Sequence, residues 1–281
     1  MVTKGEVCAL VAEGGAARGI FTTGLLDVFS EEGFNPFDFY IGVSAGAGNI
    51  AAYLADMPGR NLKIFNDYSL RKEFINIPRF LLGGHLMDLD WLWEKTIAEI
   101  RLDLKTIYAR NRPFVVCMTD VLTGKPVYKD TDADNLEHSL KASSALPLLY
   151  RDFPVVEGRS MVDGGLSDSI PVKHAISMGA TKIMVIRTRP KKYLKKTSWV
   201  RRLPSNLLRR YPEIKNALNN RADMYNETLS FIRNPPEGVH IIEVCPPDTF
   251  KTPRISKDPE VVLKGYQIGR SMAREVMKNW C

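Results

Sequence analysis

The order of strand-like and helix-like segments near the start of this chain limits its fold more than any other feature. Residues 6–12 (EVCALVA) form a short apolar run rich in β-formers that stops at Gly-Gly, as a buried strand does on entering a tight loop. Residues 18–32 predict a helix, 37–41 a second strand and 45–55 a second helix. This order is typical of an α/β domain with a parallel sheet.

The same pattern continues along the chain. Apolar runs at 113–119 and 181–186 predict further buried strands, and residues 239–244 predict a late strand. Residues 171–178 predict a helix with proline in its first turn, and 260–280 predict a closing helix with an apolar stripe. We expect the sheet to be mainly parallel and covered by helices.

Length and composition suit a single domain over residues 1–281. The mean hydropathy is −0.16, and no apolar run approaches the roughly 18 residues of a transmembrane helix. We expect no secretory signal, and the four cysteines lack the spacing of a disulfide framework or a zinc site. A cytoplasmic protein, either free or peripheral to the membrane, is therefore predicted.

Positive charge is concentrated in one part of the chain. Residues 191–221 hold ten Lys or Arg and one acid, a net charge of +9, whereas the whole chain carries +7. We expect a basic peripheral segment at about 190–235, which contacts anionic membrane through 191–221 and Trp199 or is simply a solvated surface. No nucleic-acid-binding motif accompanies the charge, so no nucleic-acid partner is expected.

A GxSxG pattern, Gly42-Val43-Ser44-Ala45-Gly46, stands between the second predicted strand and the second predicted helix. A serine on a sharp strand-to-helix turn needs small neighbours, because the backbone crowds itself there. Ser44 would lie at the positive end of the helix, where N–H groups point toward developing negative charge. The pattern predicts a nucleophile. On the motif alone, a bystander serine in a glycine-rich helix entry stays open.

A second glycine-rich turn, residues 14–19 (GGAARG), joins the first predicted strand to the first helix. Its backbone N–H groups are free to bind an anion, and Arg18 adds a positive charge. The spacing matches neither GxGxxG nor GxxxxGK(S/T), which disfavours a nucleotide-binding loop. A plain tight turn and an oxyanion hole remain, and the oxyanion hole fits a GxSxG that follows one βα unit later.

A nucleophilic serine needs a base. None of the four histidines, His85, His138, His174 and His240, stands where a catalytic histidine is expected, in a short loop after a late strand. Asp163 precedes two glycines at a predicted strand end, so its carboxylate can approach another side chain. Asp-Gly-Gly by itself is most often a turn.

Taken together, four segments resemble the patatin-like phospholipase family. They are EGGAARG (13–19), GVSAG (42–46), ASSALP (142–147) and MVDGGLSDSIP (161–171), in this order within the first 190 residues. The resemblance implies a three-layer α/β/α fold with a mainly parallel central sheet. It also implies a Ser–Asp dyad that works without histidine.

Carried over by position, the resemblance makes Ser44 the nucleophile and Asp163 the base. The N–H groups of Gly14, Gly15 and Ala16 would form the oxyanion hole, with Arg18 at the family's basic position. The glycines that support these motifs are Gly19, Gly42, Gly46, Gly164 and Gly165.

Two positions depart from the family pattern. Ala16 stands where the family usually has a third glycine, and alanine serves there only if the backbone does not need a positive φ. Ser169 stands where the family often has asparagine. Neither change touches the proposed dyad, so we expect the mechanism of the family to be kept. The two changes bear on the substrate range, which the family pattern therefore predicts less well.

We therefore expect a serine lipid acyl hydrolase, a phospholipase or esterase that needs no metal or organic cofactor. Acyl transfer or thioester hydrolysis with the same dyad is an alternative, as is a non-catalytic membrane-binding protein that keeps the fold. Residues 80–93, rich in Leu, Met and Trp around Gly83-Gly84, predict either a lid over an acyl pocket or ordinary core.

Overall fold

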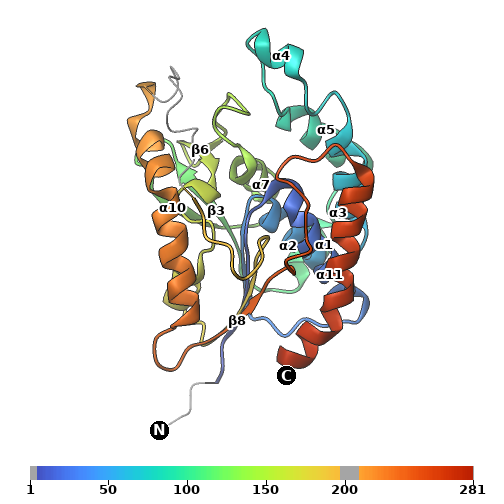
Figure 1. Ribbon diagram of the computed structural model, residues 1–281, viewed down its shortest axis with the longest axis vertical. Coiled ribbons are helices and arrows are strands. Elements are labelled where there is room, and N and C mark those ends of the chain that lie inside the picture. Colours follow the sequence, from blue (N-terminus) through green and yellow to red (C-terminus); the bar gives the residue numbers. More distant parts are fainter. Residues whose placement is uncertain (1–4, 197–208, 281) are drawn as a thin grey trace.

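The computed structural model describes residues 5–196 and 209–280, and its elements form three layers (Figure 1). The strands are β1 Cys8–Ala12, β2 Phe39–Val43, β3 Phe114–Asp120, β4 Pro126–Asp130, β5 Val155–Val156, β6 Arg159–Asp163, β7 Lys182–Ile186 and β8 His240–Val244. The described helices are α1 Ile20–Glu31, α2 Ala45–Leu54, α3 Arg60–Asn66, α4 Ile77–Leu81, α5 Leu89–Ile100, α6 Leu104–Ala109, α7 Leu136–Ser144, α8 Val172–Ser177, α10 Pro212–Arg233 and α11 Pro259–Trp280.

The strands form one mixed sheet in the order β5-β6-β3-β2-β1-β7-β8, with β4 paired to β3 beside this path. The strands from β3 to β8 along the path run parallel, while β4, β5 and β6 pair antiparallel. The predicted α/β fold with a mainly parallel central sheet is confirmed.

Side chains of β1 alternate between the two faces of the sheet. Leu10 and Ala12 pack in the core under α1, α2 and α11, whereas Ala9 and Val11 pack in the core under α8 and α10. Because both faces are covered, all five positions of β1 are buried. This burial explains why the strand is a continuous apolar run rather than an alternating one.

Helix α11 packs closely along α1, and two glycines permit the contact. A Cβ on Gly24 would lie 2.1 Å from the carbonyl oxygen of Tyr266, and one on Gly269 would lie 2.2 Å from that of Phe21. The apolar stripe predicted for residues 260–280 is the buried face of α11. The C-terminal part of the chain thus completes the core that the N-terminal units begin.

Among the described residues, no helix is long and apolar enough to cross a membrane. Cys8, Cys117 and Cys245 carry free thiols, and Cys281 lies outside the described residues.

Candidate active site

Ser44 lies on a strained turn between β2 and α2. It follows the last residue of β2 and is the N-cap of α2, with φ 51° and ψ −126°. A non-glycine residue rarely adopts this conformation, which costs of order 1–3 kcal/mol and persists only where the surroundings enforce it. The turn lifts the serine out of the sheet and places it at the positive end of α2.

The glycines of GxSxG are required by close backbone contacts. A Cβ on Gly42 would lie 2.3 Å from the Cα of Ala47, and one on Gly46 would lie 2.5 Å from the carbonyl oxygen of Ala12. Both neighbours are backbone atoms and have no room to withdraw. The steric reason inferred for these two positions from the sequence therefore holds in the structure.

Ser143, in the ASSALP segment, holds the Ser44 turn in place. Its Oγ accepts a hydrogen bond from the backbone N–H of Ser44 at 2.8 Å and donates one to the carbonyl oxygen of Cys117 at 2.6 Å. The hydroxyl is fully buried and so links β3 to the turn without competition from water. No local sequence signal reveals this role, because the three residues are far apart in the chain.

The register of the sheet brings Asp163 toward Ser44. Strand β2 pairs with β3 up to Val43 and Cys117, and β6 pairs with β3 from Asp163 and Met118 onward. Because β4 pairs along the opposite edge of β3, β2 and β6 share one edge and meet end to end. The nucleophile candidate and the base candidate thus converge where β2 stops.

Asp163 is 3% exposed and firmly held. Its N–H donates to the carbonyl oxygen of Ala145 at 2.9 Å, and its Oδ1 accepts from the N–H of Gly165 at 2.8 Å. Within the described residues no hydrogen bond joins its carboxylate to the Ser44 hydroxyl, and Oδ2 has no partner. The second oxygen is therefore free to accept a proton. A Cβ on Gly164 would lie 2.2 Å from the carbonyl oxygen of Cys117, so this glycine lets the segment lie against β3.

The loop after β1 lies against the Ser44 turn. A Cβ on Gly14 would be 3.1 Å from the Cβ of Ser44. In the described chain, the N–H groups of Gly14, Gly15 and Ala16 have no acceptor, whereas those of the next two residues are used. The N–H of Ala17 donates to the carbonyl oxygen of Arg254 at 3.1 Å, and that of Arg18 donates within the turn. Three donors are thus left for a developing oxyanion.

Ala16 has a φ of 49°, so the condition set for alanine at this position is not met. The backbone needs a positive φ where the family usually has glycine, and alanine adopts it at a cost of about 1–2 kcal/mol. The next glycine of the motif, Gly19, has a different role: a Cβ there would lie 3.0 Å from the Cβ of Ala45.

The four histidines lie away from these groups. His85 stacks on Tyr150, and His138 bonds the carbonyl oxygen of Val155. His174 stacks on the ring of Tyr128, and His240 begins β8 at the surface. None lines the cavity beside Ser44.

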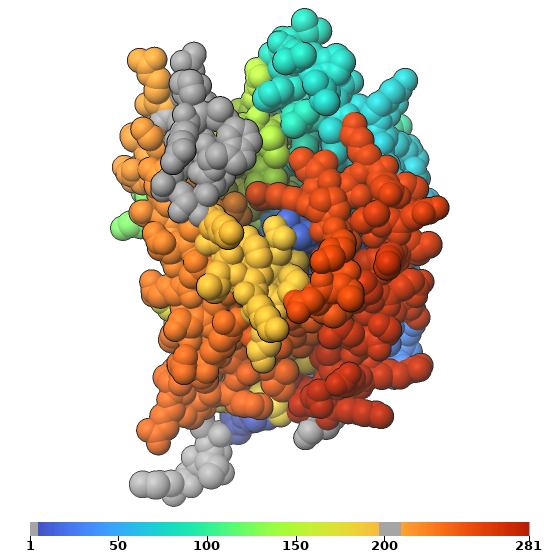
Figure 2. Space-filling model, in the orientation of Figure 1, coloured from blue at the N-terminus to red at the C-terminus, as the bar shows by residue number. Residues whose placement is uncertain are grey.

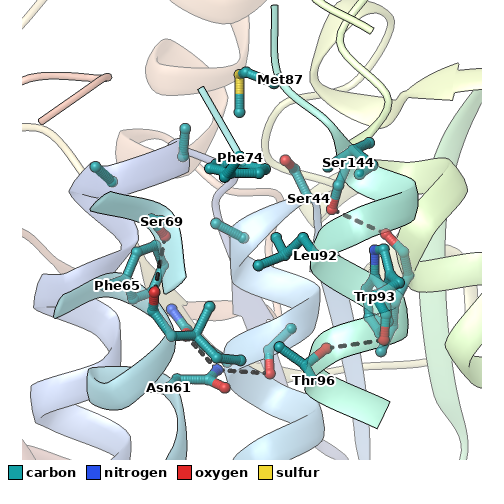
Figure 3. Close-up of a pocket in the computed structure, with 18 of the residues that line it drawn as sticks. Ser44, Asn61, Phe65, Ser69, Phe74, Met87, Leu92, Trp93, Thr96 and Ser144 are labelled. Carbon is teal, nitrogen blue, oxygen red and sulfur yellow. Dashed lines mark hydrogen bonds between the residues drawn. The ribbon is translucent and has the colours of Figure 1, made fainter. Parts of the chain in front are cut away.

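An apolar cavity of about 150 Å³ opens beside Ser44 (Figure 3). Phe65, Leu92 and Trp93 form part of its wall, and Phe74 and Met87 lie toward one end. Asn61, Thr96 and Ser144 add a few polar groups. Such a lining suits an acyl chain, with polar atoms confined to fixed points.

The core interpretation of residues 80–93 applies to only one part of the segment. Met87 and Leu89 are buried and line the cavity, so this half is core. Leu81 and Leu82, at the end of α4, are 78% and 90% exposed. In Figure 1, α4 projects at one end of the molecule, away from the sheet. This half is an apolar projection rather than a closed lid.

The basic segment is not wholly peripheral. Lys191, Lys192 and Lys196 are exposed, but Lys195 is partly buried, with its Nζ 4.2 Å from the ring centroid of Tyr225. Arg221 also turns inward, and its Nε donates to the carbonyl oxygen of Gly165 at 2.5 Å.

The helix that follows begins at Pro212 and packs on the sheet through the side chains Tyr225, Leu229 and Ile232. Trp199, Leu203, Leu207 and Leu208 lie outside the described residues.

The sheet, the strained serine turn and the loop against it define an α/β domain of the patatin type. Residues 10–176 match the patatin-like phospholipase family, and the chain belongs to this family of lipid hydrolases. Residues 211–281 match a second family, described as a domain of unknown function, DUF6363.

The proteins similar to this chain include one relative by sequence and one solved structure. The uncharacterized protein YjjU of Escherichia coli strain K12 is 36% identical over 274 residues, which cover 95% of this chain and 76% of that protein. The solved structure of VipD from Legionella pneumophila aligns with 98% of this chain and 67% of its own, at 13% identity and a TM-score of 0.49.

Proposed function

We propose that this protein is a serine lipid acyl hydrolase that works through an acyl-enzyme on Ser44, with Asp163 as the base. The observation that carries the proposal is the position of Ser44. It lies on a strained turn beside an apolar cavity, next to a loop with three N–H groups that have no acceptor among the described residues. An ester whose acyl chain enters the cavity would present its carbonyl carbon to the serine and its carbonyl oxygen to the loop.

In this reaction a single group, the Asp163 carboxylate, transfers the proton in both the acylation and the deacylation step. Ser44 Oγ attacks the ester carbonyl while Asp163 takes the hydroxyl proton, and the N–H groups of Gly14, Gly15 and Ala16 stabilise the oxyanion. Collapse of the tetrahedral intermediate expels the alcohol, which takes the proton from Asp163. Water then attacks the acyl-enzyme, Asp163 accepts its proton, and the fatty acid leaves as the proton returns to Ser44 Oγ.

The contacts of Asp163 support this role. The N–H of Gly165 fixes one carboxylate oxygen and so orients the other, which has no partner in the described residues. Hydrogen bonds to catalytic groups are often long before substrate binds, so the missing bond to Ser44 is compatible with a base that engages on substrate binding.

The test is esterase activity with a short nitrophenyl ester, together with fluorophosphonate labelling. Ser44→Ala should abolish labelling and lower kcat by at least about 10³-fold, and Asp163→Asn should cost a similar amount, with the double variant hardly worse. Each of the four His→Ala variants should keep most activity. A histidine variant as inactive as Ser44→Ala would replace the dyad by a triad.

An alcohol acceptor in the same assay separates hydrolysis from acyl transfer. Free fatty acid as the main product supports a hydrolase, whereas an acylated acceptor as the main product supports a transferase. Absence of labelling on folded protein would instead support the non-catalytic alternative.

Contact with an anionic membrane is part of the proposal. Leu81 and Leu82 offer exposed apolar side chains, and Lys191, Lys192 and Lys196 offer positive charge at about 1 kcal/mol each or less near an anionic surface. Changing these three lysines to Gln should abolish low-salt co-sedimentation with anionic vesicles and leave hydrolysis of a soluble ester unchanged. Lys195 is kept in this variant because it faces inward. Equal binding by the variant and the wild type would refute the membrane contact.

A further inference from the structure

Four cations from distant parts of the chain meet beside the catalytic loops. Arg18 follows β1, Lys195 follows β7, Arg254 follows β8, and Arg221 is on α10. Burial and then the charge of Arg189 lower the pKa of Arg18 to about 10. Burial likewise lowers the pKa of Arg221 to about 10, with Arg254 as the next cause. Burial and then Arg221 lower the pKa of Lys195. The geometry agrees: Lys195 Nζ lies 4.2 Å from the ring centroid of Tyr225, one turn along α10 from Arg221. The carbonyl oxygen of Arg254 accepts from the N–H of Ala17, the residue before Arg18.

Two of these cations have no partner for their buried donors. Arg18 is 8% exposed, and neither its side chain nor that of Arg254 donates a hydrogen bond to any described atom. The Nε atoms of both are buried and unpaired. None of the four cations forms an ion pair with a carboxylate in the described residues, and residues 197–208 contain no Asp or Glu. Burying a cation without compensation is costly, so the arrangement favours a bound anion.

The acids near the cluster do not neutralise it. Glu13 is buried, and its carboxylate already accepts from the N–H of Thr188 at 2.7 Å and the hydroxyl of Tyr225 at 2.9 Å. Asp163 is the other acid among the causes of the shifts. With Arg189, whose charge also acts on Arg18, five cations face these two carboxylates, so positive charge is in excess when all are ionised.

The cluster adjoins both the base and the acyl cavity. A Cβ on Gly165 would lie 2.9 Å from Asp163 Oδ1 and 3.3 Å from Arg221 Nη2, so the two groups flank the same backbone. Arg254 lines the cavity that contains Ser44, and its carbonyl oxygen holds the N–H of Ala17. In Figure 2 the N-terminal chain (blue) reaches the surface between the segment near residue 190 (yellow) and the loop after β8 (orange-red).

We propose that Arg18, Lys195, Arg221 and Arg254 form a binding site for a phosphate monoester, so that the substrate is an acyl ester that carries a terminal phosphate. A phosphate monoester is close to a dianion at neutral pH and has three acceptor oxygens, which match the excess of positive charge and the unpaired guanidinium donors. A phosphocholine or phosphoethanolamine group carries a positive charge of its own, which these four cations would repel. The inference rests on the proposed function and specifies its substrate.

The test compares three esters with the same acyl chain: 1-oleoylglycerol 3-phosphate, 1-oleoylglycerol and 1-oleoylglycerophosphocholine. The wild type should have the highest kcat/KM on the phosphate monoester. Arg254→Gln and Lys195→Gln should each lower that value by about 10- to 100-fold and change the value for 1-oleoylglycerol little. Lys257→Gln, which removes one exposed charge three residues from Arg254 in the sequence, is the matched control. Equal fluorophosphonate labelling of all variants shows that the catalytic groups are intact.

Inorganic phosphate distinguishes a lipid headgroup from a free ion. Competitive inhibition of ester hydrolysis by phosphate, weakened in Arg254→Gln but not in Lys257→Gln, supports the site. Binding of phosphate without preference for the phosphate ester would overturn the substrate assignment and leave a site for the free ion. Equal rates on all three esters, or equal losses in the variants and the control, would refute the cluster as a binding site. Loss of labelling and of all ester hydrolysis in the wild type would instead refute the hydrolase itself.

Discussion

Ser143→Ala is the change that best tests how the Ser44 turn is held. The side chain is fully buried and joins the N–H of Ser44 to the carbonyl oxygen of Cys117. Removing the hydroxyl leaves the N–H of Ser44 buried without an acceptor, at a cost of about 1–3 kcal/mol, and also removes a hydrogen bond to Cys117. We expect the free energy of unfolding to fall by about 2 kcal/mol, measured by urea denaturation.

The same change should affect catalysis through the turn. Ser44 occupies a conformation that costs of order 1–3 kcal/mol and persists because its neighbours enforce it. Without the anchor the turn relaxes and the hydroxyl loses its alignment. We expect kcat on a nitrophenyl ester to fall by about 10- to 100-fold, because small displacements of reacting groups are costly. KM should change little because the acyl cavity is untouched.

Ser144→Ala is the matched control. Ser144 Oγ donates a hydrogen bond to the carbonyl oxygen of Leu140 within the same helix. Its removal therefore leaves no buried group outside α7 without a hydrogen-bond partner. We expect a loss of less than about 0.5 kcal/mol for this variant. If Ser143→Ala is no less stable than Ser144→Ala, or if it keeps the wild-type kcat, the anchoring role of Ser143 is wrong.

Three further predictions concern the same region. Ala16→Gly should raise the free energy of unfolding by about 0.5–1 kcal/mol in urea, because glycine adopts the φ of 49° without strain; a destabilised variant would contradict this. Gly46→Ala should destabilise by about 1–3 kcal/mol or more and reduce fluorophosphonate labelling, since its Cβ would lie 2.5 Å from a carbonyl oxygen; wild-type stability would contradict the packing described. Leu92→Trp should fill the cavity beside Ser44 and shift the preferred acyl chain toward shorter lengths, with short-chain activity kept; an unchanged chain-length profile would place the acyl chain elsewhere.

Local sequence determined most of the central α/β framework. The strands β1, β3 and β7 are largely continuous apolar runs because neighbouring layers cover both faces of the sheet, and such runs are visible without knowing the neighbours. The GxSxG turn was predictable for a related reason. Gly42 must be small because of Ala47 in the same strand-turn-helix unit and Gly46 because of Ala12 on the neighbouring strand β1, but both glycines belong to one motif of five consecutive residues.

Only the tertiary structure decided which distant groups meet. The convergence of Ser44 and Asp163 depends on β2 and β6 sharing one edge of β3, and the role of Ser143 depends on the same strand. Lys195 and Arg221 belong to a strongly basic stretch that predicted a peripheral segment, yet both turn inward toward the catalytic loops. The number of charged residues in a segment does not determine which way their side chains point. The direction of a side chain is set by the strand register and helix packing that fix its backbone, and these depend on contacts between residues far apart in the chain.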